Sequence, residues 1–274
     1  MGPAIALALA LATAPDTAIV QSGRLELRGL LWRPEGEGPF PAVLFNHGSG
    51  HGVRSASGDR DEHTMEWQAD QIGPVFARHG YMFLYLFRRG TGLSSSQGMN
   101  SSDFWERAMV RQGQDARNKL QLRLMETVEL NDAFAGLRFL RKLRDVDKNR
   151  VAVAGHSFGG SLTLLMTERD SSLRAAIVFA GAARSWPQAP QLRQRLTAAV
   201  GRTVVPTFFI AAANDYSVAP AESLSAEMDR LAKAYKLKIY PLVGKTPQEG
   251  HSFVHLRVAT WEPDVFAFLD PLMR

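Results

Sequence analysis

Segments with apolar runs or two-residue alternation, which predict strands, take turns along this chain with segments of helical spacing, which predict helices. Residues 17–21 and 25–32 predict two strands separated by a Ser22–Gly23 turn. The unbroken apolar run at 42–46 is typical of a central parallel strand covered on both faces. Further apolar strands are predicted at 81–87, 151–154, 175–179, 204–211 and 237–242. Helical spacing predicts helices at 66–78, 115–143, 158–168, 224–235 and 264–269.

This alternation predicts an α/β fold with a mostly parallel, doubly wound sheet, because each parallel crossover needs a connection of helical length. No repeat or low-complexity linker interrupts residues 16–274, so we predict one domain there. The segment 184–203 lies between two predicted strands and contains Trp186–Pro187, Pro190 and a short helical stretch. It is the candidate for a short cap.

Residues 1–15 form a separate, signal-like segment. Residues 5–14 are small and apolar, and Ala12–Thr13–Ala14 is typical of the end of a secretory signal peptide. Against this, no Lys or Arg precedes the run, and Pro15 is unfavourable just after a cleavage site. A trimmed or misassigned signal, and hence export to the periplasm or exterior, is the favoured interpretation. A loosely packed N-terminal helix of a cytoplasmic protein is the alternative.

Composition narrows the chemistry. The 274 residues are 45% hydrophobic and 22% charged, as in a globular protein with a substantial core, which excludes disorder as the dominant state. The absence of cysteine excludes disulfides, a thiolate nucleophile and a Cys-based zinc site. The densest basic run, 138–150, is diluted by Asp145 and Asp147 and has no aromatic interleaving, so no nucleic-acid partner is expected. No stable membrane insertion is expected either, since no apolar run is long enough.

The most specific motif is Gly155-His156-Ser157-Phe158-Gly159-Gly160, which matches G-x-S-x-G. An apolar strand runs directly into it and a helix runs directly out, which is the setting of a nucleophile elbow. A serine on such a turn projects its hydroxyl above the sheet, and the two flanking glycines avoid collisions with neighbouring backbone. We therefore predict Ser157 to be a nucleophile.

A serine hydroxyl needs a nearby base, and in this arrangement the base follows the nucleophile along the chain. Of seven histidines, two come after Ser157: His251 and His255. His251 follows the last predicted strand in a loop before a helix, where it reaches the carboxyl edge of the sheet. His255 lies one helical turn further on and is the alternative.

The acid that orients the base is expected after a strand between the two. Asp215 ends the run Ile210-Ala211-Ala212-Ala213-Asn214-Asp215 and is the aspartate of that loop. Glu222 and Asp229 come later, in the next predicted helix, and suit helix-surface roles. We predict Asp215 to accept the Nδ1–H of His251.

Two backbone donors are needed for the oxyanion of a tetrahedral intermediate. The Phe158 N–H follows the nucleophile directly, and the Ser49 N–H lies in the first loop after the central strand, in His47-Gly48-Ser49-Gly50. We predict these two as the oxyanion donors. His47 is expected to hold that loop by hydrogen bonds to its backbone.

Candidate substrate contacts are Trp186, in the cap candidate, and His51, at the mouth of the site. Arg88 and Arg89 are expected to hold their loop by hydrogen bonds, with attraction of an anionic group as the alternative.

With these residues placed, the chain resembles the dienelactone-hydrolase-like branch of the α/β-hydrolases. The resemblance covers roughly residues 40–270 and implies a sheet of about eight strands and hydrolysis through an acyl-enzyme without metal or cofactor. Dienelactone hydrolases themselves use a cysteine, which this chain lacks, so the resemblance implies a serine enzyme acting on another substrate. The matching landmarks are His47-Gly48-Ser49-Gly50, Arg89-Gly90-Thr91-Gly92-Leu93-Ser94, Gly155-His156-Ser157-Phe158-Gly159-Gly160, Asn214-Asp215 and Gly250-His251-Ser252-Phe253.

The sequence thus predicts a serine esterase that cleaves small-molecule carboxylic esters through Ser157, His251 and Asp215. An amidase or small peptidase is the alternative, since Gly159-Gly160 also resembles the catalytic domain of prolyl-oligopeptidase-type peptidases. Acyl transfer to an alcohol and a non-catalytic binding role on the same fold remain open.

Overall fold

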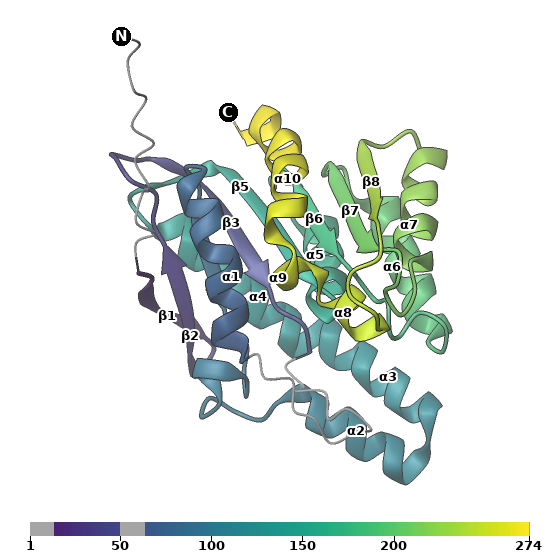
Figure 1. Cartoon of the computed structure of the whole chain (residues 1–274). Helices are drawn as coiled ribbons and strands as arrows, with labels where there is room; N and C mark the ends of the chain where they lie inside the picture. The colour runs from purple at the N-terminus through teal and green to yellow at the C-terminus, as the bar shows by residue number, and fades with distance from the viewer. Residues whose placement is uncertain (1–13, 50–63, 274) are drawn as a thin grey trace.

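The computed structural model describes residues 14–49 and 64–273. They form one eight-stranded sheet in the order β1-β2-β4-β3-β5-β6-β7-β8, with helices on both faces (Figure 1). β1 pairs antiparallel with β2, β2 antiparallel with β4, and the remaining neighbours run parallel. The predicted α/β-hydrolase fold class is therefore confirmed. The strands are β1 (Asp16–Ser22), β2 (Leu25–Trp32), β3 (Phe40–Asn46), β4 (Met82–Leu86), β5 (Val146–His156), β6 (Ala176–Phe179), β7 (Thr207–Ala212) and β8 (Tyr235–Tyr240).

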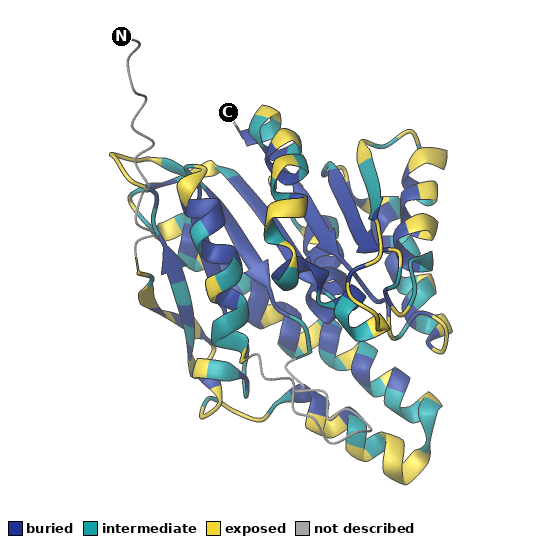
Figure 2. Cartoon of the chain, in the orientation of Figure 1, coloured by how far each residue is buried: buried dark blue, intermediate teal, exposed yellow. Residues whose placement is uncertain are grey.

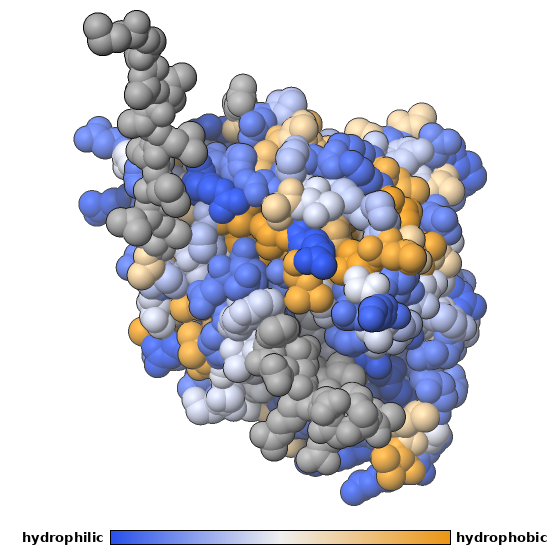
Figure 3. Space-filling view, viewed as in Figure 1, coloured by the Kyte–Doolittle hydropathy of each residue, from blue (hydrophilic) through white to orange (hydrophobic). Residues whose placement is uncertain are grey.

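Two apolar cores lie on the two faces of this sheet. One face packs against α1 (Met65–Arg78) and α10 (Val258–Met273), and the other against α4 (Leu130–Lys142), α5 (Phe158–Arg169), α6 (Pro190–Arg202) and α7 (Ala219–Arg230). Figure 2 shows the sheet buried between these helices. The face seen in Figure 3 is mostly hydrophilic, with apolar side chains gathered over its centre. The apolar strands are therefore covered on both sides, as their sequences predicted.

Parallel pairing brings the carboxyl ends of the central strands to one edge of the sheet. In the registers of β3, β5 and β6, Asn46 lies beside Gly155, and His156 lies beside Phe179. The loops that follow β3, β5 and β7 consequently emerge close together. The short α8 (Pro247–His251) and α9 (Phe253–Leu256) lie near the same edge.

Two helices extend beyond this edge, at the bottom of Figure 1. α2 (Ser101–Gln112) was not predicted, whereas the predicted helix 115–143 begins as α3 (Gln114–Leu124). A π-helical turn, Met125–Glu129, joins α3 to α4. Gly113, at φ 82°, separates α2 from α3, and the two helices pack against each other. A glycine suits this junction because side-chain-bearing residues disfavour positive φ.

The segment 184–203, the candidate cap, contains α6, which packs against α5 and α7 on the face of the sheet. Its first residues, 184–188, approach the carboxyl edge. A capping role for this segment stays a prediction, and α2 and α3 are the helices that project beyond the sheet here. Residues 1–13 of the signal-like segment lie outside the described residues. Within residues 14–49 and 64–273, no helix has the length and apolarity needed to span a membrane.

Candidate active site

Ser157 stands on a strained turn between β5 and α5. Its backbone has φ 55° and ψ −117°, a conformation that non-glycine residues rarely adopt. Gly155 and Gly159 make the turn possible, because a Cβ on Gly155 would overlap the carbonyl of Gly159, and one on Gly159 would overlap the carbonyl of Asn46. The serine hydroxyl is thereby held above the carboxyl edge of the sheet.

The structure brings together the three residues that the sequence placed in one mechanism. His251 Nε2 lies 2.9 Å from Ser157 Oγ, and His251 Nδ1 lies 2.7 Å from Asp215 Oδ1. Asp215 follows β7, and both it and His251 are buried. His251 is the last residue of α8 instead of a loop residue. A capping box between Thr246 and Glu249 begins that helix.

Two residues that sequence analysis left without a role hold His251 in place. The buried His156 ring donates from Nε2 to the His251 carbonyl at 2.8 Å, and the two rings lie 4.8 Å apart. The Asn214 amide nitrogen donates to the carbonyls of Val243 and Thr246, at 2.8 and 2.9 Å. These bonds tie the loop after β7 to the segment that leads into α8. The only sequence signal for either residue is its position next to Ser157 or Asp215.

His47 holds the loop after β3, as expected from its position. Its Nδ1 donates to the Gly48 carbonyl at 2.7 Å, and its Nε2 accepts the Arg88 backbone N–H at 3.0 Å. This pattern fixes the neutral tautomer with the proton on Nδ1. Burial, with a contribution from the Arg88 charge, lowers the pKa of His47 well below its ordinary value, which keeps the ring neutral.

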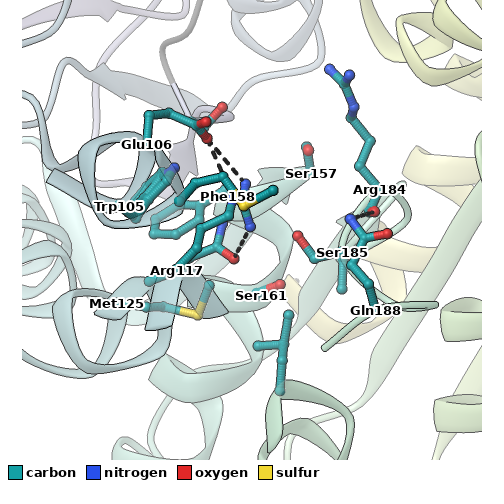
Figure 4. A pocket seen from close by; sticks show the side chains of 15 residues that line it. Trp105, Glu106, Arg117, Met125, Ser157, Phe158, Ser161, Arg184, Ser185 and Gln188 are labelled. Atoms are coloured by element: carbon teal, nitrogen blue, oxygen red, sulfur yellow. Dashed lines mark hydrogen bonds and ion pairs between the residues drawn. The ribbon is translucent and has the colours of Figure 1, made fainter. Parts of the chain in front are cut away.

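A cavity of about 710 Å³ adjoins Ser157 (Figure 4). Ser49 and Phe158, the predicted oxyanion residues, both line it, as does the buried Ser161 one helical turn after the nucleophile. Its walls mix apolar and polar groups from α2, α3, α5, α6 and the turn between α3 and α4. They include Trp105, Glu106, Met109, Arg117, Gln121, Met125, Arg184, Ser185, Gln188 and Leu192.

Several polar groups of the cavity wall hydrogen-bond to one another. Arg117 Nε donates to Glu106 Oε1 at 3.3 Å, and Arg117 Nη1 donates to Gln121 Oε1 at 3.2 Å (Figure 4). The Gln188 amide donates to the Arg184 carbonyl at 3.1 Å. Glu106 and Arg117 thus face the same space as an ion pair, and Arg184 adds a second cation to the wall.

The predicted substrate contacts do not line this cavity within the described residues. Trp186 is 7% exposed, packs in the core and is not among the residues that line the cavity, so a substrate contact from Trp186 stays a prediction. Trp105, from the unpredicted helix α2, lines the cavity with its ring 5.4 Å from that of Phe158. His51 lies outside the described residues. Among the described residues, no group of three or more His, Cys, Asp or Glu side chains is placed to hold a metal ion.

Because His47 and His156 are buried as neutral rings, we expect the free energy of unfolding to fall in acid. Burial is the main cause that lowers the pKa of both His47 and His156 well below the ordinary range. In the unfolded chain these rings titrate near pH 6.5, so below that pH the unfolded state binds more protons than the folded state. The free energy of unfolding should therefore fall in acid, by up to about 1.4 kcal/mol per pH unit for each ring.

Urea unfolding between pH 7.5 and 5.5 measures this dependence. His47→Gln, which removes one of the two rings, should show a shallower fall over the same interval. A wild-type stability that is constant or rises toward pH 5.5 would contradict the assignment of neutral rings.

The sheet order, the strained serine between β5 and α5 and the loops gathered at the carboxyl edge define an α/β-hydrolase. The model of the dienelactone hydrolase family matches residues 28–259, and the chain belongs to this family, which confirms the resemblance seen in the sequence. Esterase EstD of Thermotoga maritima is 31% identical over 148 residues, which are 53% of this chain. That match spans 28% of the relative's length.

Solved structures share the fold at low sequence identity. A putative dienelactone hydrolase from Klebsiella pneumoniae has a TM-score of 0.64 at 14% identity, over 93% of this chain and 97% of that one. An esterase from Pyrococcus furiosus has a TM-score of 0.63 at 14% identity, over 95% and 91%. An acylaminoacyl peptidase from Pyrococcus horikoshii has a TM-score of 0.65 at 18% identity, but this chain covers 41% of it.

Proposed function

We propose that the protein hydrolyses carboxylic esters through a covalent acyl-enzyme on Ser157. The observation that carries this proposal is the unbroken hydrogen-bonded series from Asp215 through His251 to the Ser157 hydroxyl, at the edge of a cavity. Membership in a hydrolase family and the similarity to an esterase over half of the chain support it.

His251 is the general base of the first step. The buried Asp215 carboxylate accepts a hydrogen bond from the Nδ1–H of His251, which leaves the Nε2 lone pair directed at Ser157 Oγ. As Oγ attacks the ester carbonyl carbon, its proton passes to Nε2, and the carbonyl oxygen becomes an oxyanion. The same proton then goes to the leaving alcohol when the carbon–oxygen bond breaks.

The second step repeats these roles with water. His251 removes a proton from a water molecule that attacks the acyl carbon, and it returns the proton to Ser157 as the acid leaves. The Asp215 charge stabilises the imidazolium formed in both steps. No proton has to cross the protein interior.

Two N–H groups are available for the oxyanion. The Phe158 N–H belongs to the first turn of α5, where backbone donors have no partner within the helix and the helix dipole favours negative charge. The Ser49 N–H lies in the loop after β3, and both residues line the cavity beside Ser157. Donors fixed before the reaction stabilise the developing charge without reorganisation.

The cavity suits the acyl part of the ester. His251 has to reach the leaving-group oxygen to protonate it, so the leaving alcohol lies on the His251 side. The cavity is lined by both predicted oxyanion residues, whereas His251 is not among its described lining residues, and this supports binding of the acyl group there. Its mixed walls suit small or medium acyl groups, including aromatic ones that contact Trp105.

Matched esters and amides test this function. p-Nitrophenyl acetate and butyrate should be turned over, with a burst of nitrophenol if deacylation is slow. The p-nitroanilides of the same acids should be turned over far more slowly, and Ser157→Ala should turn over neither. Faster cleavage of the anilides would identify an amidase instead. Failure of wild type to cleave either series would favour a binding role on this fold.

A further inference from the structure

Arg88 is buried directly behind the candidate oxyanion loop. Its side chain is 2% exposed, and its Nε donates to Glu129 Oε2 at 2.5 Å. Its Nη2 donates to the carbonyls of His47 and Gly48, at 3.0 and 2.7 Å. A buried cation is costly unless it is paired and hydrogen-bonded, so this side chain is held by strong, specific contacts.

These contacts fix the direction of the Ser49 N–H. The Gly48 carbonyl and the Ser49 N–H belong to one trans peptide unit, which is planar, so they point in opposite directions. The carbonyl accepts both Arg88 Nη2 and His47 Nδ1, each at 2.7 Å. Anchoring the carbonyl toward Arg88 turns the N–H away from Arg88, and Ser49 lines the cavity beside Ser157.

The Arg88 charge also strengthens this donor. A charge-assisted hydrogen bond to a carbonyl polarises the peptide unit, and hydrogen bonds in series reinforce one another. A more polarised Ser49 N–H stabilises an oxyanion better than an unassisted amide. Arg88 therefore acts on the reaction through a peptide bond, without touching the substrate.

We propose that Arg88 is a positioning residue that orients and polarises the Ser49 N–H as an oxyanion donor, and that Glu129 holds Arg88 in that place. This inference rests on the proposed ester hydrolysis and names a residue that its mechanism needs beyond Ser157, His251 and Asp215.

The π-helical turn supports the role of Glu129. Glu129 ends the turn Met125–Glu129, is 4% exposed, and also accepts the Ser101 hydroxyl at 2.5 Å. A π-turn inserts an extra residue into a helix and often marks a functional site. Here the same turn directs Met125 into the cavity wall and Glu129 to Arg88.

The adjacent pair Arg89–Asp132 is a matched control. Arg89 donates from Nε and Nη2 to the two carboxylate oxygens of Asp132, at 2.8 and 2.7 Å, and Asp132 is fully buried. The bonds of Arg89 in the described part of the chain run to Asp132, and none reaches residues 47–49. Loss of this pair removes an ion pair with a buried carboxylate between the same loop and the start of α4, without releasing the Gly48 carbonyl.

The experiment compares Arg88→Gln and Glu129→Gln with Arg89→Gln and Asp132→Asn, measuring kcat, KM and urea unfolding for each. We expect the first two variants to lose kcat about 10- to 100-fold at nearly unchanged KM, somewhat less than outright removal of an oxyanion donor. Their rate of reaction with a small fluorophosphonate should fall in parallel, because that reaction also develops negative charge on oxygen. The second two should be destabilised to a similar extent and keep kcat.

Glu129→Gln preserves the shape of the side chain, so it keeps the comparison informative where Arg88→Gln does not fold. Equal losses of kcat in both pairs, or wild-type kcat in the folded Arg88 and Glu129 variants, would overturn the inference. A wild type that neither hydrolyses esters nor reacts with the fluorophosphonate would instead overturn the proposed function.

Discussion

Ser157→Ala is expected to lower kcat for p-nitrophenyl acetate about 10⁵- to 10⁶-fold, the loss seen when a serine nucleophile is removed from a comparable site. Alanine fits the turn but removes the hydroxyl oxygen that lies 2.9 Å from His251 Nε2. Stopped-flow measurement of nitrophenol release, at enzyme concentrations high enough to detect the residual rate, gives this value.

The rate of a double variant tests whether Ser157 and His251 act together. Residues that act in one proton transfer lose their contributions together, so Ser157→Ala/His251→Ala should be no slower than either single variant. Circular dichroism and urea unfolding verify that the variants remain folded. A residual rate in Ser157→Ala within tenfold of wild type would exclude Ser157 as the nucleophile.

Asp215→Asn is expected to lower kcat about 10⁴-fold while leaving the shape of the site intact. An asparagine amide can donate to His251 Nδ1, which selects the tautomer with the proton on Nε2. That nitrogen then faces the Ser157 hydroxyl as a donor and cannot accept its proton. The effect therefore comes from the tautomer and not from lost packing.

Asp264→Asn is the matched control for removal of the Asp215 carboxylate charge. The Asp264 carboxylate accepts the Tyr240 hydroxyl and Lys238 at 2.5 Å each, and Lys238 with Tyr240 holds the pKa of Asp264 at about 2. Because Asp264 contacts β8 and not the His251 ring, kcat should stay at the wild-type level. An Asp215→Asn variant that keeps more than a tenth of wild-type kcat would contradict the orienting role of Asp215.

The strands and the elbow could be predicted because their signals are local. β3 is apolar up to Phe45 and β5 is apolar over residues 151–154, and the strand-turn-helix context of Ser157 is contiguous in sequence. The order of nucleophile, acid and base then selected Asp215 and His251 from few alternatives. These are the residues that the structure brings within hydrogen-bonding distance.

The helix α2 could not be predicted, because its sequence carries a weak apolar stripe. Two serines and an aspartate begin it, and Trp105 is its one large buried apolar side chain. Because α2 was not predicted, nothing in the sequence pattern indicated Trp105, which lines the cavity. The π-turn at Met125–Glu129 could not be predicted for a different reason: one extra residue changes the hydrophobic periodicity of a helix very little.

The hydrogen bonds that hold the site residues in place join residues far apart in the sequence, and the hydrophobic pattern of the chain does not indicate them. Arg88 meets Glu129 across 41 residues, and His156 meets the His251 carbonyl across 95. Spacing along the chain says nothing of such pairs, because they form when separate loops converge on one sheet edge. Sequence analysis favoured a loop-holding role for Arg88, and the structure supplies its partners.

The central claim is that the Ser157 hydroxyl is the group that becomes covalently modified. Mass spectrometry after reaction with a fluorophosphonate tests it most directly. The account predicts that one phosphonyl group adds per chain and that fragmentation of the modified peptide places it on Ser157. Ser157→Ala should remain unmodified, and Asp215→Asn should react far more slowly than wild type. A phosphonyl group on another residue, or equal modification of wild type and Ser157→Ala, would contradict the account.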